Sequence, residues 1–122
     1  FHQEMNLPEG WEKYRILKLI LEPFVENAVT HGIEPKIGGG NIWLHGEQQG
    51  RYLFLEIQDD GVGVENIQEM RKGFAITNVK ERMQLFYGDE GSIEISSKRN
   101  EGTRVRIRVP VWREYDTSIS TF

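Results

Sequence analysis

Apolar residues recur at helical spacing in two separate parts of the chain. From Ile16 to His31 they follow one another at steps of three and four residues, the period of a helix that buries one face. Gly32 favours a helix end at that point. Pro23 lies inside the pattern. Because proline lacks a backbone N–H and crowds the carbonyl of Leu19, we expect the helix to bend at Pro23 or to begin shortly before it.

The second helical pattern runs from Phe74 to about Tyr87, and Gly88 favours its end. The positions expected to face inward are Ile76, Val79, Met83 and Phe86. Between the two helical patterns, residues 33–40 contain Pro35 and three successive glycines, so they predict a loop. Residues 65–72 form a further polar segment.

Alternation of apolar and polar residues predicts a first β-hairpin over about residues 41–58. Its two runs are NIWLHGE and RYLFLEIQ, joined by the polar residues Gln48, Gln49 and Gly50. One face of the second run carries Leu53, Leu55 and Ile57. The opening residues 1–8 predict a separate short strand.

A second hairpin is predicted in the last third of the chain. SIEIS is followed by a turn at residues 99–102 and then by TRVRIRVPV. In that last run the apolar residues Val105, Ile107 and Val109 alternate with arginines at positions 104, 106 and 108. We interpret the arginines as one solvated strand face.

Two helices and two hairpins with half-buried faces predict an α+β two-layer sandwich. In this fold the helices cover one face of a mixed, mostly antiparallel sheet. A length of 122 residues is sufficient for one domain with its own core, so we expect residues 1–122 to form a single unit. The chain starts at Phe1, without an initiator methionine, and we expect it to be a C-terminal fragment of a longer protein.

Composition and charge narrow the function classes. The 15 basic and 19 acidic residues are spread along the chain and leave a net charge of −4, which argues against a dedicated binder of nucleic acid or membrane surfaces. There is no cysteine, which excludes disulfides, thiolate metal sites and cysteine nucleophiles. No stretch approaches the roughly 20 apolar residues of a membrane span.

The segment QDDGVGV, residues 58–64, places two acids and two glycines directly after a predicted strand. An acid such as Asp59 can accept a hydrogen bond from an exocyclic amine, and glycines beyond it let a flat ring approach the backbone. A purine pocket and an ordinary Asp-Gly turn are both consistent with these residues.

Two further segments offer chemistry of the same kind. Asn27 presents a neutral amide oxygen on the first helix, which suits Mg²⁺ when phosphates supply the other ligands, although an Asn near a helix end is also commonly just solvated. His31 is equally consistent with a helix-end residue that interacts with the helix dipole. Residues 72–78, KGFAITN, form a small-residue turn into a helix, where free backbone N–H groups can hold phosphate.

The order of these segments resembles the ATP-binding domain of sensor histidine kinases, in the superfamily shared with DNA gyrase, heat-shock chaperones and MutL. The resemblance is carried by NAVTHG on a helix, DDGVG after a strand, a glycine turn opening a helix and EGTRVRIRVP in a final strand, and it spans about residues 5–111. LEPFVENAVTHGI, NVKERMQLFYG and the short lid resemble the branch usually attached to a membrane sensor.

The resemblance implies ATP and Mg²⁺ as cofactors and assigns roles to individual residues. Asn27 corresponds to the Asn that coordinates Mg²⁺, and Asp59 to the acid that hydrogen-bonds the adenine amino group. Thr103 corresponds to the Thr of the final Gly-Thr pair, which supports the adenine pocket. The other implied nucleotide-binding positions are Gly61, Gly63 and Val64 after the acid, and Gly73, Phe74, Ala75 and Ile76 near the phosphates.

Three positions depart from the family pattern. Thr30 stands where many relatives have a basic residue, so the corresponding phosphate contact is neutral or comes from His31 or Lys36. Ala75 replaces the second glycine of the lid and restricts the backbone there. Pro23 occupies the position of the general-base Glu of the hydrolysing relatives, so we do not expect self-contained ATP hydrolysis.

The implied activity is transfer of the ATP γ-phosphoryl group to a histidine on a separate dimerisation domain of the same parent, and from there to a response regulator. The implied parent is a homodimeric, membrane-anchored bacterial sensor with this domain in the cytoplasm, and no nucleic-acid partner is expected. His2, His31 and His45 do not fit the phosphoacceptor. Two alternatives remain open: a serine kinase of the anti-sigma-factor type, and a nucleotide-binding module without kinase activity.

Overall fold

The computed structural model describes residues 2–7, 15–33, 36–63 and 74–110. Five strands of this part form one sheet in the order β1-β2-β3-β5-β4. They are β1 (His2–Asn6), β2 (Asn41–Gln49), β3 (Tyr52–Asp59), β4 (Ser92–Lys98) and β5 (Gly102–Pro110). β1 pairs with β2 in parallel, and the other neighbours are antiparallel. The predicted mixed, mostly antiparallel sheet is confirmed.

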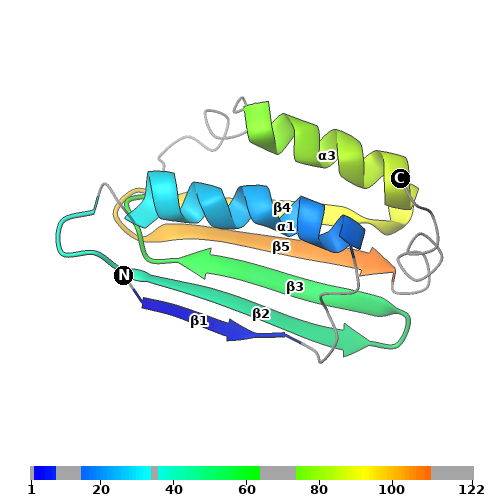
Figure 1. Ribbon diagram of the computed structural model, residues 1–122, viewed down its shortest axis with the longest axis horizontal. Coiled ribbons are helices and arrows are strands. Elements are labelled where there is room, and N and C mark those ends of the chain that lie inside the picture. Colours follow the sequence, from blue (N-terminus) through cyan, green and yellow to red (C-terminus); the bar gives the residue numbers. More distant parts are fainter. Residues whose placement is uncertain (1, 8–14, 34–35, 64–73, 111–122) are drawn as a thin grey trace.

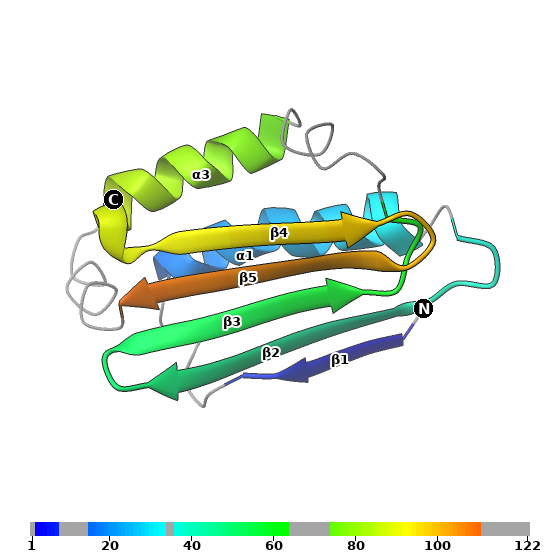
Figure 2. The ribbon, with the colours of Figure 1, turned by 180° about the vertical axis from the view of Figure 1, so that it is seen from behind.

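Both long helices cover the same face of the sheet, as the front and back views show (Figures 1 and 2). α1 (Arg15–Asn27) continues as a π-helical segment (Ala28–Ile33), and α3 (Phe74–Tyr87) is followed by a 3₁₀ turn (Gly88–Glu90). The predicted α+β sandwich is therefore confirmed, and α3 has the predicted bounds.

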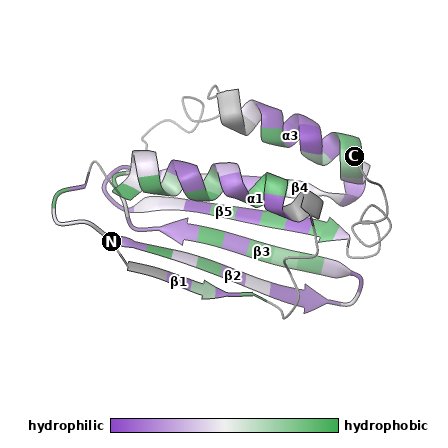
Figure 3. Ribbon diagram, in the orientation of Figure 1, coloured by the Kyte–Doolittle hydropathy of each residue, from purple (hydrophilic) through white to green (hydrophobic). Residues whose placement is uncertain are grey.

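The core lies between the helices and the covered face of the sheet. Hydrophobic and hydrophilic positions alternate along β3 and β5 (Figure 3), because successive side chains of a strand point to opposite faces. The predicted inward positions Leu53, Leu55 and Ile57 are buried, as are Val79 and Met83 on α3. The side chain of Ile76 lies outside the described part.

The end of α3 departs from the sequence prediction. Tyr87, which was not predicted to face inward, is 1% exposed, whereas Phe86 is only partly buried. The 3₁₀ turn after α3 leads directly into β4, so the last helical residue packs into the core under the connection. The sequence pattern does not show this, because it reports the period of the helix and not the path of the chain beyond it.

α1 begins at Arg15, one residue before the predicted helical pattern, and contains Pro23 in its interior, so of the two expected outcomes the helix does not begin shortly before Pro23. The helical path also continues past Gly32 to Ile33. Gly32 accepts a hydrogen bond from the backbone N–H of Val62, at 3.0 Å between N and O. This contact joins the end of the helical path to a distant loop.

The first hairpin is tighter than predicted. Gln48 and Gln49 belong to β2, and the connection consists of Gly50 and Arg51 alone. Gly50 has a φ of 62°, a left-handed conformation that glycine adopts without steric cost. The cross-strand pairing of Gln49 with Tyr52 extends the ladder to the turn.

The arginines of β5 lie on the face away from the helices. Arg104 and Arg106 both approach Glu56, with Nε–Oε distances of 3.0 and 3.6 Å. The Arg108 guanidinium lies 5.1 Å from the centre of the Tyr52 ring. These cations are engaged by neighbouring side chains of the sheet, in keeping with a solvated strand face.

Candidate functional site

Asp59 ends β3 on the helix-covered side of the sheet, in the same alternating set as Leu53, Leu55 and Ile57. It is 4% exposed and is the one charged residue that is buried within the described ranges. Its Oδ1 accepts the backbone N–H of Gly61 at 2.9 Å, and the backbone of Thr103 donates a second hydrogen bond. A carboxylate can accept about four hydrogen bonds, so this one retains acceptor capacity.

Burial raises the pKa of Asp59 above its ordinary value. The two backbone N–H groups and the more distant Lys36 oppose this effect, but they do not reverse it. The protein therefore keeps a desolvated carboxylate at the end of a strand. Such a group gains from a ligand that donates a hydrogen bond to it.

The glycines around Asp59 allow backbone segments to approach one another closely. A Cβ on Gly61 would collide with the backbone of Gly32, and a Cβ on Gly63 with the carbonyl of Lys98. A Cβ on Gly32 would lie 2.9 Å from Asp59 Oδ1. The DDGVG glycines thus join the end of β3 to the first helix and to the turn between β4 and β5, in addition to any contact with a ligand.

Asp60 ties the same loop to the start of β2. It accepts the backbone N–H and the side-chain Nδ2 of Asn41, at 2.6 and 2.9 Å. Lys36 Nζ donates to the Asp60 carbonyl at 2.7 Å and lies 3.8 Å from its carboxylate. Burial alone would raise the pKa of Asp60, but the Asn41 hydrogen bonds and the Lys36 charge hold it below its ordinary value.

The predicted residues of the first helix lie at the end of α1 and in the π-helical segment that follows it. Asn27 is half-buried at the last residue of α1, and Thr30 is exposed one turn later. The hydrogen bond between Gly32 and Val62 holds this segment beside the Asp59 loop. The side chain of His31 lies outside the described part.

The structure does not bring every predicted position together. Lys36, considered as a phosphate contact, faces Asp60 in this structure. Val64 and Gly73 lie outside the described residues. Phe74, Ala75 and Ile76 open α3, and only their backbone is described.

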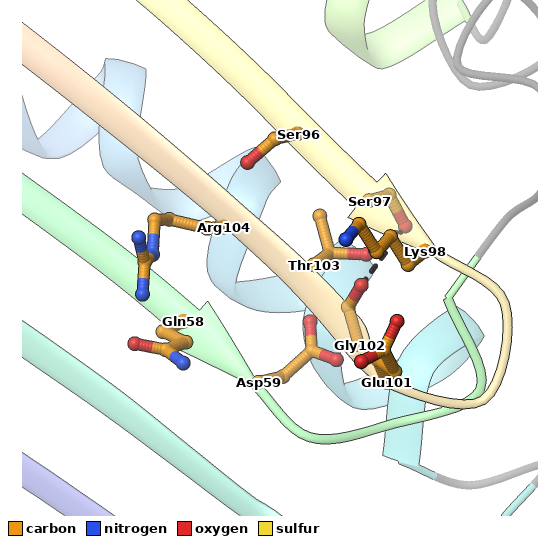
Figure 4. Close-up of a pocket in the computed structure, with 9 residues that line it drawn as sticks. All are labelled: Gln58, Asp59, Ser96, Ser97, Lys98, Glu101, Gly102, Thr103 and Arg104. Carbon is orange, nitrogen blue, oxygen red and sulfur yellow. Dashed lines mark hydrogen bonds between the residues drawn. The ribbon is translucent and has the colours of Figure 1, made fainter.

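A cavity of about 390 Å³ lies at the ends of β3, β4 and β5 (Figure 4). Asp59 and Thr103, which the sequence predicted, are in its lining, whereas Asn27 is not. The residues that sequence reasoning missed are Gln58, Ser96, Ser97, Lys98, Glu101, Gly102 and Arg104. By strand alternation Gln58 and Arg104 lie on the open face and Asp59 and Thr103 on the helix face, so the cavity wraps around the strand ends.

The hydroxyl group of Ser97 supports Thr103 from the neighbouring strand. Ser97 Oγ lies 2.8 Å from Thr103 Oγ1 and 3.1 Å from the carbonyl of Gly102. Ser97 and Thr103 are cross-strand partners. The predicted hairpin with a turn at residues 99–102 was the available signal for this pair, because it sets the two residues opposite each other.

The described residues contain no group of three or more His, Asp or Glu side chains that could hold a metal ion. None of the described helices is long and apolar enough to cross a membrane.

Comparisons with known proteins agree with this geometry. Residues 12–113 match the family model described as histidine kinase-, DNA gyrase B- and HSP90-like ATPase. The sensor histidine kinase BtsS of Escherichia coli is 27% identical over 108 residues, which cover 88% of this chain and 19% of that protein. YesM of Bacillus subtilis, also a sensor histidine kinase, is 29% identical over 102 residues, 81% of this chain and 18% of that protein. The chain thus spans about a fifth of these relatives.

Solved structures share the fold. The histidine kinase domain of the blue-light-activated kinase of Erythrobacter litoralis superimposes with a TM-score of 0.77 at 17% identity, covering 98% of this chain and 55% of that one. The catalytic domain of the histidine kinase ThkA gives a TM-score of 0.63 at 15% identity, covering 89% and 79%. The predicted resemblance is confirmed: this chain belongs to the family of histidine kinase-, DNA gyrase B- and HSP90-like ATPases.

Proposed function

We propose that this domain binds ATP with Mg²⁺ and supplies the γ-phosphoryl group to a histidine on a separate dimerisation domain of a sensor kinase, for onward transfer to a response regulator. The observation that carries the proposal is Asp59, a buried carboxylate with remaining acceptor capacity at the end of β3. Family membership and the sensor-kinase relatives support the activity.

The chemistry of the proposed site residues suits an adenine nucleotide. Asp59 would accept the exocyclic amine of adenine, with Thr103 held beside it by Ser97. Asn27 would offer its amide oxygen to Mg²⁺. When bound, the ion neutralises charge on the β- and γ-phosphates. The contribution of the chain is to place the nucleotide rather than to donate or remove a proton.

The wider assignments belong to the same proposal. The relatives are about five times longer than this chain, so we place the acceptor histidine in another part of a longer, homodimeric parent that is anchored in a bacterial membrane. This domain would then face the cytoplasm. The serine-kinase alternative is less favoured, because the curated matches named above are sensor histidine kinases.

Calorimetric titration with a nonhydrolysable ATP analogue tests the proposal. We expect the parent domain to bind the analogue more tightly with Mg²⁺ than without it. Asp59→Asn should weaken binding at least about tenfold. The side-chain NH₂ of Asn would then face the adenine amine, and because both groups are donors, the amine would be left without an acceptor. An inosine analogue, which lacks the exocyclic amine, should bind the parent weakly and lose little in the variant.

The matched control is Glu47→Gln, the same chemical change at an exposed position of β2. It should leave the affinity unchanged. Absence of binding to the parent at millimolar analogue would overturn the proposed function, and equal losses for adenine and inosine analogues would overturn the role of Asp59.

A further inference from the structure

Pro23 leaves one carbonyl of α1 without its regular partner. In an α-helix the N–H of residue i+4 donates to the carbonyl of residue i, and proline has no N–H to donate to Leu19. In this structure Arg82, on α3, donates from Nη1 to the Leu19 carbonyl at 2.7 Å. A side chain from the second helix thus replaces the missing backbone donor of the first.

This bond connects the two helices that carry predicted nucleotide-binding residues. Leu19 and Pro23 precede Asn27 by two turns and one turn of α1. Beyond Asn27, the helical path is fixed to the Asp59 loop by the hydrogen bond between Gly32 and Val62. α3 lies beside α1 on the same face of the sheet (Figure 1), and its first residues were predicted to face the phosphates.

We propose that Arg82 is a positioning residue for the nucleotide site, because it sets the last turns of α1 against α3 through the Leu19 carbonyl. This inference rests on the proposed function. A guanidinium is suited to the task, since it is always charged and its donors are held in one plane. The bond holds Asn27 at a constant distance from the start of α3. The proposed Mg²⁺ and phosphates would lie between Asn27 and the start of α3.

The acceptor is a backbone atom, and this separates the proposal from ordinary helix packing. Truncation of the half-exposed Leu19 side chain leaves the carbonyl in place. Restoration of a backbone donor at position 23 makes Arg82 dispensable. The effects of substituting Arg82 and Pro23 should therefore be non-additive.

The test is a double-mutant cycle with Arg82→Gln, Pro23→Ala and the combined variant. Urea unfolding reports the link, and titration with the ATP analogue with and without Mg²⁺ reports the positioning. Arg82→Gln should lower the folding equilibrium constant about fivefold and weaken Mg²⁺-dependent binding about tenfold, with less than about a twofold effect when Mg²⁺ is absent. In the Pro23→Ala background, the same change should alter each quantity by less than about twofold.

Lys80→Gln removes an exposed cation of the same helix and is the matched control, with no expected effect. Arg82→Lys retains a charged donor and should lie between the parent and Arg82→Gln. If Arg82→Gln alone does not fold, the Pro23→Ala variants should fold, and their affinities decide the outcome.

Three results would overturn the inference. Equal losses of stability and of affinity on Arg82→Gln in the parent and in the Pro23→Ala variant would show that Arg82 does not replace the donor missing at Pro23. Equal losses with and without Mg²⁺ would reduce Arg82 to a stabilising contact. Absence of analogue binding to the parent would remove the proposed function and the positioning role together, whereas binding to the parent with no effect of Arg82→Gln would remove the positioning role alone.

Discussion

Asp59 and Asp60 are adjacent in the chain and have opposite electrostatic environments. Asp59 lies on the buried side of β3, while Asp60 turns outward and accepts hydrogen bonds from Asn41 beside Lys36. The pKa of Asp59 is raised and that of Asp60 is lowered. A sequence of two acids before a glycine does not show which of them is desolvated, because that depends on the face of the strand.

This contrast predicts opposite pH dependences of stability. A raised pKa in the folded state contributes stability that is complete below the ordinary pKa and is lost as the pH rises through the folded value. The unfolding free energy of Asp59→Asn, relative to that of the parent, should therefore increase as the pH rises from about 3 to 7. Urea unfolding at several pH values measures this difference.

For Asp60 the sign is reversed. A lowered pKa contributes stability that is present above the ordinary value and is lost as the pH falls through the folded value. The penalty of Asp60→Asn should thus be largest at neutral pH and should shrink below about pH 4, in the same urea series. If both variants shift in the same direction with pH, the assignment of the two environments is wrong.

At the scale of elements, the strand order sets which parts of the sheet are protected. β3 and β5 each have a neighbour on both sides, whereas β1 and β4 are the outer strands of the described sheet. The ladder between β3 and β5 runs from Tyr52 with Pro110 to Asp59 with Thr103. The two residues proposed to hold adenine therefore belong to a ladder between two inner strands.

Amide hydrogen exchange should follow this order. We expect the amides of β3 and β5 to exchange at least about tenfold more slowly than the outward-facing amides of β1 and β4, because central strands open only with larger unfolding events. Exchange measured by mass spectrometry or NMR resolves the strands. Protection of β4 equal to that of β3 would contradict the described order.

The predicted helices and strands are present in the structure, and most differences from the prediction lie at their ends. Periodicity located α3 and both hairpins because each buries one face of a regular element. It predicted the helix through Pro23, but it does not contain the hydrogen-bond donors that Arg82 supplies from another helix and Val62 from a loop. Both compensating partners are remote in sequence, so no local pattern contains them.

At the scale of the whole molecule, the position of His45 does not meet the requirements of a phosphoacceptor. His45 lies on β2 opposite Glu56, on the face of the sheet away from the helices, and its ring nitrogen lies 3.3 Å from Asn6 Nδ2. Asp59 lies on the other face. The described histidine therefore cannot reach a nucleotide held on the helix side without crossing the sheet.

Incubation of this chain alone with γ-labelled ATP and Mg²⁺ should consequently leave it unlabelled. Addition of the phosphoacceptor domain of the parent protein should produce an acid-labile phosphohistidine on that domain. Stable acid-labile label on the isolated chain would contradict the expectation. A labelled serine on a partner protein would instead favour the serine-kinase alternative.

The sequence by itself determined the types of element, the α+β class and the family, because these follow from apolar periodicity and from short motifs in a given order. Through the family resemblance it also predicted that Asp59 and Thr103 belong to one site, and both line the same cavity. The tertiary structure decided that Asp59 is the buried acid, that Asp60 and Lys36 stabilise a loop, and that the DDGVG glycines join three backbone segments. Burial, close backbone approach and replacement of a missing donor depend on partners distant in the chain, which only folding brings together.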